Sequence, residues 1–163
     1  MVVYIDTSVI VAAIDKGDSK NQAADRFLSR EREKIISPLV LVEIFSVVSR
    51  NYNRLISKFD VRIDERDLPA VIARLSMRKY NLNLIHPFEK ELTIFGKVPA
   101  EIKLAFTLSH KLKLRTLDLL HLSIAWCLKL NGYSIDGFAT FDNEILKKAE
   151  KVENLTDIRV FEP

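Results

Sequence analysis

The sequence contains a single cysteine, Cys127, among 163 residues, and only four glycines and five prolines. One cysteine cannot form a disulfide within the chain, and so little glycine and proline excludes a collagen-like or glycine-rich disordered chain. The three histidines, His86, His110 and His121, give little support for a zinc site built from Cys and His ligands. These absences favour one compact domain with an ordinary hydrophobic core.

Long apolar runs are also missing. The run that begins at Pro38 ends at Val42, far short of the roughly 18 residues that a membrane-spanning helix needs. The first residues lack the basic start and the continuous apolar stretch of a signal peptide. Together with the lone cysteine, this predicts a soluble protein of the cytosol that has no membrane partner.

Neither sign of charge dominates, because 25 Lys and Arg residues stand against 22 Asp and Glu residues. The net charge of +3 leans towards an anionic partner, but an ordinary solvated surface explains this balance equally well. The hydrophobic content of 48% is ample for one core. Composition alone therefore does not nominate nucleic acid as a ligand.

Short apolar runs alternate with longer segments of helical periodicity. The predicted strands are residues 2–5, 34–36, 82–85, 137–141 and 158–161. The predicted helices are residues 8–15, 19–30, 39–56, 68–80, 101–111, 117–129 and 143–151. This order predicts an α/β domain over residues 1–163, with a mainly parallel central β-sheet flanked by helices on both faces. For Leu92 to Phe95 a short strand, a helical turn and a packed loop all fit.

Two acids stand at the carboxyl ends of predicted strands, where functional crevices of α/β sheets lie. Asp6 follows the first strand, and Asp142 follows the strand that ends at Phe141. A third acid, Glu43, is surrounded by apolar residues in a helix for which Ser37 is the expected cap. A buried carboxylate needs a cation, a hydrogen-bond partner or a proton, and a metal ion would satisfy it.

The fourth acid, Asp118, lies near the start of a predicted helix. Taken singly, Asp118 is a favourable charge at a helix end and Asp6 is a helix cap. Taken together, the four acids predict an all-oxygen site for Mg²⁺ or Mn²⁺ rather than Zn²⁺. Such an ion can neutralise a phosphodiester, acidify a bound water and stabilise the leaving oxygen, so no Ser or Cys nucleophile is needed.

Four segments also carry a resemblance to a known family: VYIDTS at residues 3–8, LVEI at 41–44, LDLLHLSIA at 117–125 and ATFD at 139–142. In this order they resemble the PIN domain family, and in particular the VapC-type toxins of bacterial and archaeal toxin–antitoxin pairs. The resemblance implies a metal-dependent endoribonuclease that hydrolyses RNA phosphodiester bonds as the toxin of such a pair. The alternative is a PIN-fold RNA-binding or RNA-processing module outside a toxin–antitoxin system.

By this resemblance one or two Mg²⁺ or Mn²⁺ ions would be held by four catalytic residues: Asp6, Glu43, Asp118 and Asp142. Thr7 or Ser8, together with Thr140, would orient the carboxylates or a water on the metal. Asn143 occupies a position where some members have a further acid, and Glu144 is next to it. The resemblance further implies an RNA substrate, an inhibitory antitoxin protein and a homodimer.

Basic residues flank the acidic segments, and either a bound RNA backbone or a solvated surface accounts for them: Arg50, Arg54, Lys111, Lys113 and Arg115. His121, three residues after Asp118, is interpreted as a packed histidine rather than a site residue. The segment from about residue 57 to residue 99 is longer than compact family members need, which predicts an added helix or a partner surface.

Two other classes of protein are disfavoured. A phosphotransferase with Asp6 as nucleophile would place a second acid two residues later, where Ser8 stands. A nucleotide-binding protein would have a glycine-rich phosphate loop after a strand, and the sequence has none.

Overall fold

The computed structural model describes residues 1–30, 32–56, 63–87, 90–94 and 96–163. Its central sheet has five parallel strands in the order β3-β2-β1-β6-β7. These strands are β1 (Val2–Ile5), β2 (Glu33–Ile36), β3 (Leu82–Leu84), β6 (Ile135–Ala139) and β7 (Arg159–Phe161). The predicted α/β fold with a parallel central sheet is confirmed.

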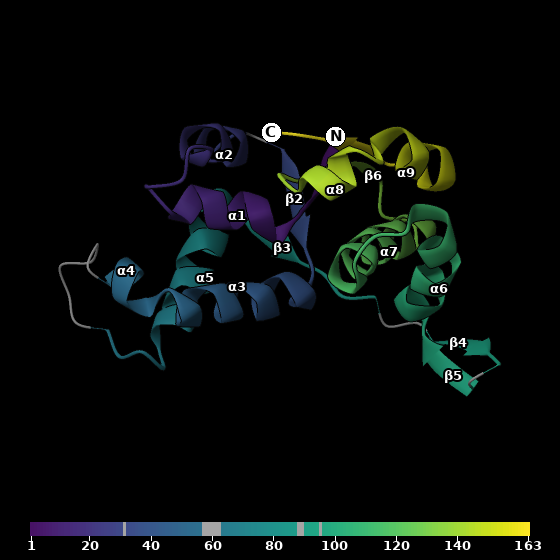
Figure 1. Cartoon of the computed structure of the whole chain (residues 1–163), viewed down its shortest axis with the longest axis horizontal. Helices are drawn as coiled ribbons and strands as arrows, with labels where there is room; N and C mark the ends of the chain where they lie inside the picture. Colours follow the sequence, from purple (N-terminus) through teal and green to yellow (C-terminus); the bar gives the residue numbers. More distant parts are fainter. Residues whose placement is uncertain (31, 57–62, 88–89, 95) are drawn as a thin grey trace.

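Helices cover both faces of this sheet, as Figure 1 shows. One face carries α1 (Thr7–Ile14), α2 (Asn21–Leu28), α3 (Pro38–Arg50), α4 (Tyr52–Ile56) and α5 (Leu68–Tyr80). The other face carries α6 (Ala100–Leu112), α7 (Thr116–Leu130) and α9 (Ala149–Thr156), and α8 (Asn143–Leu146) follows β6. The chain crosses the sheet in one direction from β1 through β2 to β3 and in the other from β3 to β6 and β7, and right-handed crossovers in opposite directions put their helices on opposite faces. Within the described ranges, none of the helices is both long and apolar enough to cross a bilayer.

The central position of β1 explains its composition. Val3, Tyr4 and Ile5 are 0% exposed, as expected for a parallel strand that is covered on both faces. In the register between β1 and β6, Ile5 lies opposite Ala139. The carboxyl ends of the two strands therefore reach the same edge of the sheet, where the candidate site lies.

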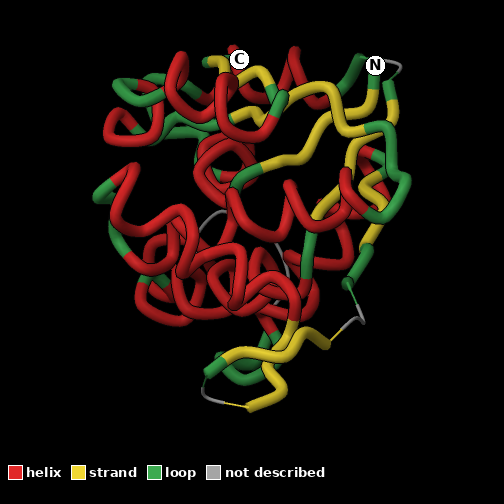
Figure 2. The backbone as a smooth tube through the Cα atoms, turned by 90° about the vertical axis from the view of Figure 1, so that its right-hand side faces the viewer, coloured by secondary structure: helices red, strands yellow, loops and turns green. Residues whose placement is uncertain are grey.

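The segment from residue 57 to residue 99 contains α5, which lies where an added helix was predicted, and a separate hairpin. This hairpin consists of β4 (Lys90–Thr93) and β5 (Gly96–Pro99), paired antiparallel. It projects from the body of the molecule below α6 (Figures 1 and 2). Of the alternatives for Leu92 to Phe95, the strand is found at Leu92 and Thr93. Residues 57–62, 88–89 and Phe95 lie outside the described residues.

Several predicted boundaries are wrong for local reasons. The predicted helix 39–56 is divided into α3 and α4 at Asn51, where the Val47 carbonyl oxygen accepts both the backbone N–H (3.2 Å) and the side-chain amide (2.8 Å) of Asn51. β6 ends at Ala139 rather than at Phe141, whose backbone N–H donates to the Ser8 hydroxyl (3.0 Å) instead of to a strand. The predicted helix 143–151 is divided into α8 and α9 by a turn in which the Lys148 N–H bonds to the Ile145 carbonyl oxygen.

Ser37 occupies the predicted N-cap position of α3, but its hydroxyl does not cap the helix. The hydroxyl lies instead 2.7 Å from the phenolic oxygen of Tyr4 in β1. Both side chains are 0% exposed. Burial in the core raises the pKa of Tyr4 well above its usual range, so Tyr4 keeps its proton and acts as a neutral hydrogen-bonding group.

Candidate active site

The junctions after β1 and β6 bring the first and last acids together. Asp6 continues the pairing of β1 with β6, because its backbone N–H donates to the Ala139 carbonyl oxygen (3.0 Å). Asp142 is the N-cap residue of α8, and its Oδ1 accepts hydrogen bonds from the backbone N–H groups of Glu144 (2.7 Å) and Ile145 (3.4 Å). The predicted meeting of strand-end acids at one edge of the sheet is found.

Hydroxyl groups hold the Asp6 carboxylate in place. Its Oδ2 accepts hydrogen bonds from Ser8 Oγ (2.5 Å) and Thr140 Oγ1 (2.7 Å). Thr140 Oγ1 in turn accepts the backbone N–H of Asp142 (2.9 Å). One oxygen of Asp6 is thus saturated by donors, and Thr140 links the segments that carry Asp6 and Asp142.

Glu43 reaches the same region from α3. Its Oε2 accepts the hydroxyl hydrogen of Thr7 and lies 2.7 Å from Nε2 of His121. Partial burial raises the pKa of Glu43, but the hydrogen bonds from His121 and Thr7 outweigh burial and leave this pKa below its ordinary value. Glu43 is therefore ionised at neutral pH.

Asp118 contributes the fourth carboxylate from the first turn of α7. Its Oδ2 is buried and has no hydrogen-bond partner among the described residues. Burial raises the pKa of Asp118, and the negative charges of Asp142 and Asp6 raise it further, against a smaller lowering by Arg115. A buried carboxylate oxygen that no donor satisfies is a ligand that a cation would stabilise.

All four acids line one pocket of about 350 Å³ between α1, α3 and α7, together with Arg50 and His121. In the described part of the chain, no Lys or Arg side chain forms an ion pair with any of the four. One ligand atom each from Asp6, Glu43 and His121 lies within 4.8 Å of the others. Several carboxylate oxygens around one pocket fit Mg²⁺ or Mn²⁺, which prefer oxygen ligands.

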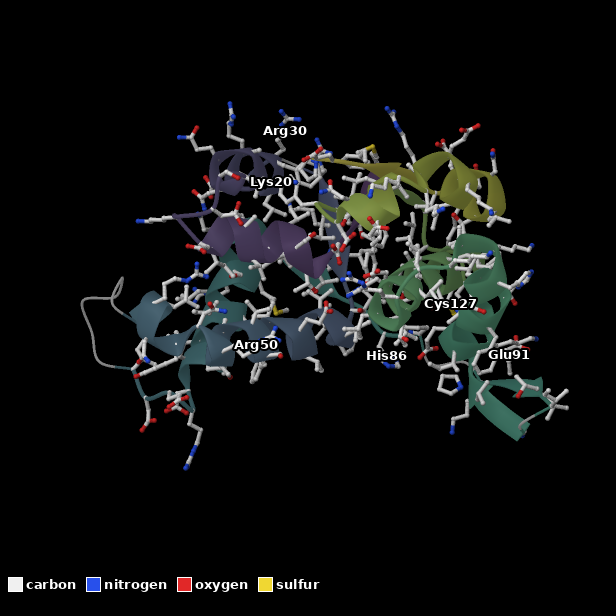
Figure 3. All side chains as sticks on the ribbon, viewed as in Figure 1. Lys20, Arg30, Arg50, His86, Glu91 and Cys127 are labelled. Carbon is white, nitrogen blue, oxygen red and sulfur yellow. The ribbon has the colours of Figure 1, made fainter. Side chains whose placement is uncertain are left out.

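The basic residues divide into different surroundings. Arg50 lies on α3 (Figure 3), and it is one of the residues that line the pocket. Arg54 instead forms an ion pair with Asp15 at the far end of α1 (2.9 Å). The others are exposed around the α6–α7 junction: Lys111, Lys113 and Arg115. Contact with RNA stays a prediction for Arg50, Lys111, Lys113 and Arg115, whereas the Arg54 side chain is engaged by Asp15.

The remaining predicted residue, Asn143, is the first residue of α8; it is exposed and is not among the residues that line the pocket. His121 is the residue that the sequence interpretation undervalued. It is buried, as expected for a packed histidine, and yet its ring also lines the pocket and contacts Glu43. Its position one helical turn after Asp118 was the available signal, because residues three apart share a helix face. The approach of α3, which carries Glu43, could not be read from that spacing.

Comparison with known proteins agrees with this geometry. A family model described as the PIN domain matches residues 3–151. VapBC2 from Rickettsia felis, solved bound to a DNA fragment from its promoter, superposes with a TM-score of 0.59 at 16% identity, covering 99% of this chain and 98% of that one. VapC20 of Mycobacterium tuberculosis, described as a sarcin-ricin loop cleaving toxin, gives a TM-score of 0.56 at 16% identity, covering 89% of this chain and 93% of that one. Comparison with curated protein sequences gave no match.

Proposed function

Because the chain belongs to the PIN domain family, we propose that it is a metal-dependent endoribonuclease that hydrolyses RNA phosphodiester bonds. The observation that carries the proposal is the Asp118 Oδ2 atom, which is buried with no hydrogen-bond partner among the described residues, in a pocket shared with three more carboxylates. A site used only for binding RNA would place cations, not four acids, beside a polyanion. This argues against the alternative of a purely RNA-binding module.

The four acids would hold Mg²⁺ or Mn²⁺, which supplies positive charge to the phosphate and the leaving oxygen and makes water a better nucleophile. The protein's own groups prepare that arrangement. Ser8 and Thr140 fix Asp6, and Thr7 and His121 fix Glu43, so these carboxylates need little reorganisation during the reaction.

Arg50, at the wall of the pocket, is positioned to contact a phosphate of the RNA backbone close to the reacting bond. Its side chain comes from α3, the helix that also carries Glu43. Since an Arg–phosphate contact positions the backbone without reading the bases, the proposal assigns Arg50 to binding and not to sequence choice.

The biological role we propose is that of a toxin held inactive by an antitoxin protein. The similarity to VapBC2 of Rickettsia felis and to the toxin VapC20 supports this role, as does the resemblance of the four sequence motifs. The test is expression in a bacterial host: the wild-type chain should stop growth, and an Asp118→Asn variant made at equal level should not. Equal growth with both would count against the toxin role and leave the nuclease proposal standing.

A homodimer is proposed on the same family grounds. Apolar side chains of α3 and α7 are exposed, namely Val42 (65%), Phe45 (42%) and Leu117 (47%). Light scattering with the wild type and with a Val42→Lys variant would test this, since a charge in a dimer contact should shift the mass towards the monomer. A monomeric wild type would remove the proposal.

The nuclease activity is tested with end-labelled RNAs of mixed sequence and structure. Cleavage should require Mn²⁺ or Mg²⁺, stop with EDTA, and be absent in an Asp118→Asn variant purified in parallel. Cleavage that persists in the variant would assign the activity to a contaminant or to another site. Metal binding without cleavage of any RNA would favour a binding role instead.

A further inference from the structure

A chain of hydrogen bonds runs from the core of the protein to the candidate metal pocket. Ser37 Oγ lies 2.7 Å from the Tyr4 hydroxyl, which lies 3.0 Å from Nδ1 of His121. On the other side of the ring, Nε2 of His121 lies 2.7 Å from Oε2 of Glu43. The ring itself is 2% exposed. Four side chains from β1, the start of α3, α3 and α7 are thus joined in one line.

Counting the available hydrogens assigns the donor and the acceptor of each hydrogen bond in this chain. Among the described residues, the buried Ser37 hydroxyl has no hydrogen-bond partner except Tyr4, so its hydrogen goes to the Tyr4 oxygen. Tyr4 then donates its own hydrogen to Nδ1 of His121, which must be bare. The neutral ring carries its hydrogen on Nε2 and donates it to the Glu43 carboxylate.

The opposite tautomer conflicts with the same contacts. A hydrogen on Nδ1 would be donated to Tyr4, Tyr4 would donate to Ser37, and the Ser37 hydrogen would have no acceptor in the described surroundings. The bare Nε2 would also face the lone pairs of Oε2 at 2.7 Å. A ring protonated on both nitrogens leaves the Ser37 hydrogen without an acceptor in the same way.

We propose that His121 is a positioning residue that holds the Glu43 carboxylate through its Nε2–H, with Tyr4 and Ser37 locking the ring, and that it is not a ligand of the metal. The proposal rests on the proposed metal-dependent function for its purpose. Oε2 of Glu43 is occupied by His121 and Thr7, which leaves Oε1 for a cation. Asp6 is divided in the same manner: Oδ2 is bound to two hydroxyls, and Oδ1, which lies 3.8 Å from Nε2 of His121, accepts no hydrogen bond from the described residues.

The first test needs neither metal nor RNA. In the metal-free full-length protein, the ¹⁵N resonances of the His121 ring should show a protonated Nε2 and an unprotonated Nδ1. In a Tyr4→Phe variant this tautomer preference should weaken. The control is Tyr80→Phe: the hydroxyl of the buried Tyr80 contacts Asp25 far from the site, so its removal should leave the preference unchanged. A proton on Nδ1 in the wild type would overturn the proposal.

Adding Mg²⁺ separates positioning from ligation. Nε2 should keep its hydrogen in the presence of saturating Mg²⁺, because the ion binds the carboxylates and not the ring. Loss of the Nε2 hydrogen on metal binding would make His121 a ligand and overturn the proposal. If no Mg²⁺ binds at all, the proposed function fails, while the spectrum of the metal-free protein still decides the tautomer.

A second test measures Mn²⁺ affinity by calorimetry, with folding of each variant checked by circular dichroism. His121→Leu should weaken binding by about 10- to 100-fold, as loss of a residue that orients a metal ligand usually does. His121→Gln, whose amide can place an N–H near the position of Nε2, should recover most of this loss. Unchanged affinity in the Leu variant, or a folded Gln variant as weak as Leu, would contradict the positioning role.

Discussion

The two aspartates at the ends of α1 have the same exposure and opposite surroundings. Asp6 precedes the helix and Asp15 follows it, and each is 6% exposed. Asp15 forms an ion pair with Arg54 (2.9 Å) and accepts the backbone N–H of Gly17 (3.0 Å). Asp6 accepts two hydroxyl hydrogens, and within the described residues no Lys or Arg pairs with it.

Under the proposed function, this difference separates an acid that stabilises the fold from one that would bind a metal ion. Desolvation costs both carboxylates a similar amount, but the Arg54 guanidinium compensates Asp15, whereas hydroxyl groups compensate Asp6 and Nε2 of His121 lies 3.8 Å from its Oδ1. Three further acids gather around Asp6, which makes its surroundings more negative still. Burial alone does not distinguish the two aspartates, whereas the sign of the surrounding charge does.

The largest expected effect is on cleavage. Asp6→Asn should lower the metal-dependent rate by about a hundredfold or more, because an amide is a poor ligand for Mg²⁺ and the total charge of the site falls. Asp15→Asn makes the same chemical change at the same burial and should retain the wild-type rate within about twofold. Equal losses in the two variants, measured on one labelled RNA, would contradict the distinction.

Stability should change in the reverse order. Asp15→Asn should lower the free energy of unfolding by about 1 to 3 kcal/mol, because Arg54 loses its partner charge and the amide accepts a weaker hydrogen bond. In the absence of metal, Asp6→Asn should leave the free energy of unfolding unchanged or raise it, since one of several mutually repelling charges is removed. Urea denaturation of both variants in EDTA would check this, and a destabilised Asp6→Asn beside a neutral Asp15→Asn would reverse the assignment.

A smaller effect is expected in the pH dependence of stability. Burial raises the pKa of Asp118 above its ordinary value of 3.8, so the folded protein holds this proton more tightly than the unfolded chain does. Stability is therefore lost as the pH rises from about 4 through the raised pKa, and it stays lower above that window. Asp118 is only partly buried, so we expect a difference below about 1 kcal/mol.

The measurement compares wild type with Asp118→Asn in EDTA by denaturation at about pH 4 and about pH 7. The variant should have the higher free energy of unfolding, and its difference from the wild type should be larger at the higher pH. Added Mn²⁺ should reverse the order by stabilising the wild type more than the variant, because the ion binds only the folded site. A difference in the free energy of unfolding that does not depend on pH would show that Asp118 has no raised pKa.

The smallest effect concerns the two arginines that follow Glu43. Arg50→Ala should weaken RNA binding a few-fold and reduce its salt dependence slightly, as expected for the loss of one phosphate contact. Arg54→Ala should leave RNA affinity unchanged and lower stability, because Arg54 is engaged by Asp15. Filter binding at two salt concentrations checks the RNA affinity of both variants, and denaturation checks the stability of Arg54→Ala. A loss of affinity for Arg54→Ala alone would exchange the roles of the two arginines.

Much of the fold could be predicted from the sequence because its signals are local. Buried β-branched runs such as Val2 to Ile5 and the periodic helices between them determine an α/β order, and that order restricts the sheet to few topologies. The boundaries failed where side chains form hydrogen bonds with the backbone at the ends of elements, as the Asn51 amide does at the end of α3 and the Ser8 hydroxyl does after β6.

The sequence alone determined which acids to consider, because strand ends and apolar helix faces single out Asp6, Glu43, Asp118 and Asp142. Only the tertiary structure decided the charge partner of each side chain. It pairs Arg54 with Asp15, leaves Oδ2 of Asp118 without a donor among the described residues, and places His121 against Glu43. Spacing along a helix determines which residues share a face, but the element that packs against that face comes from a distant part of the chain.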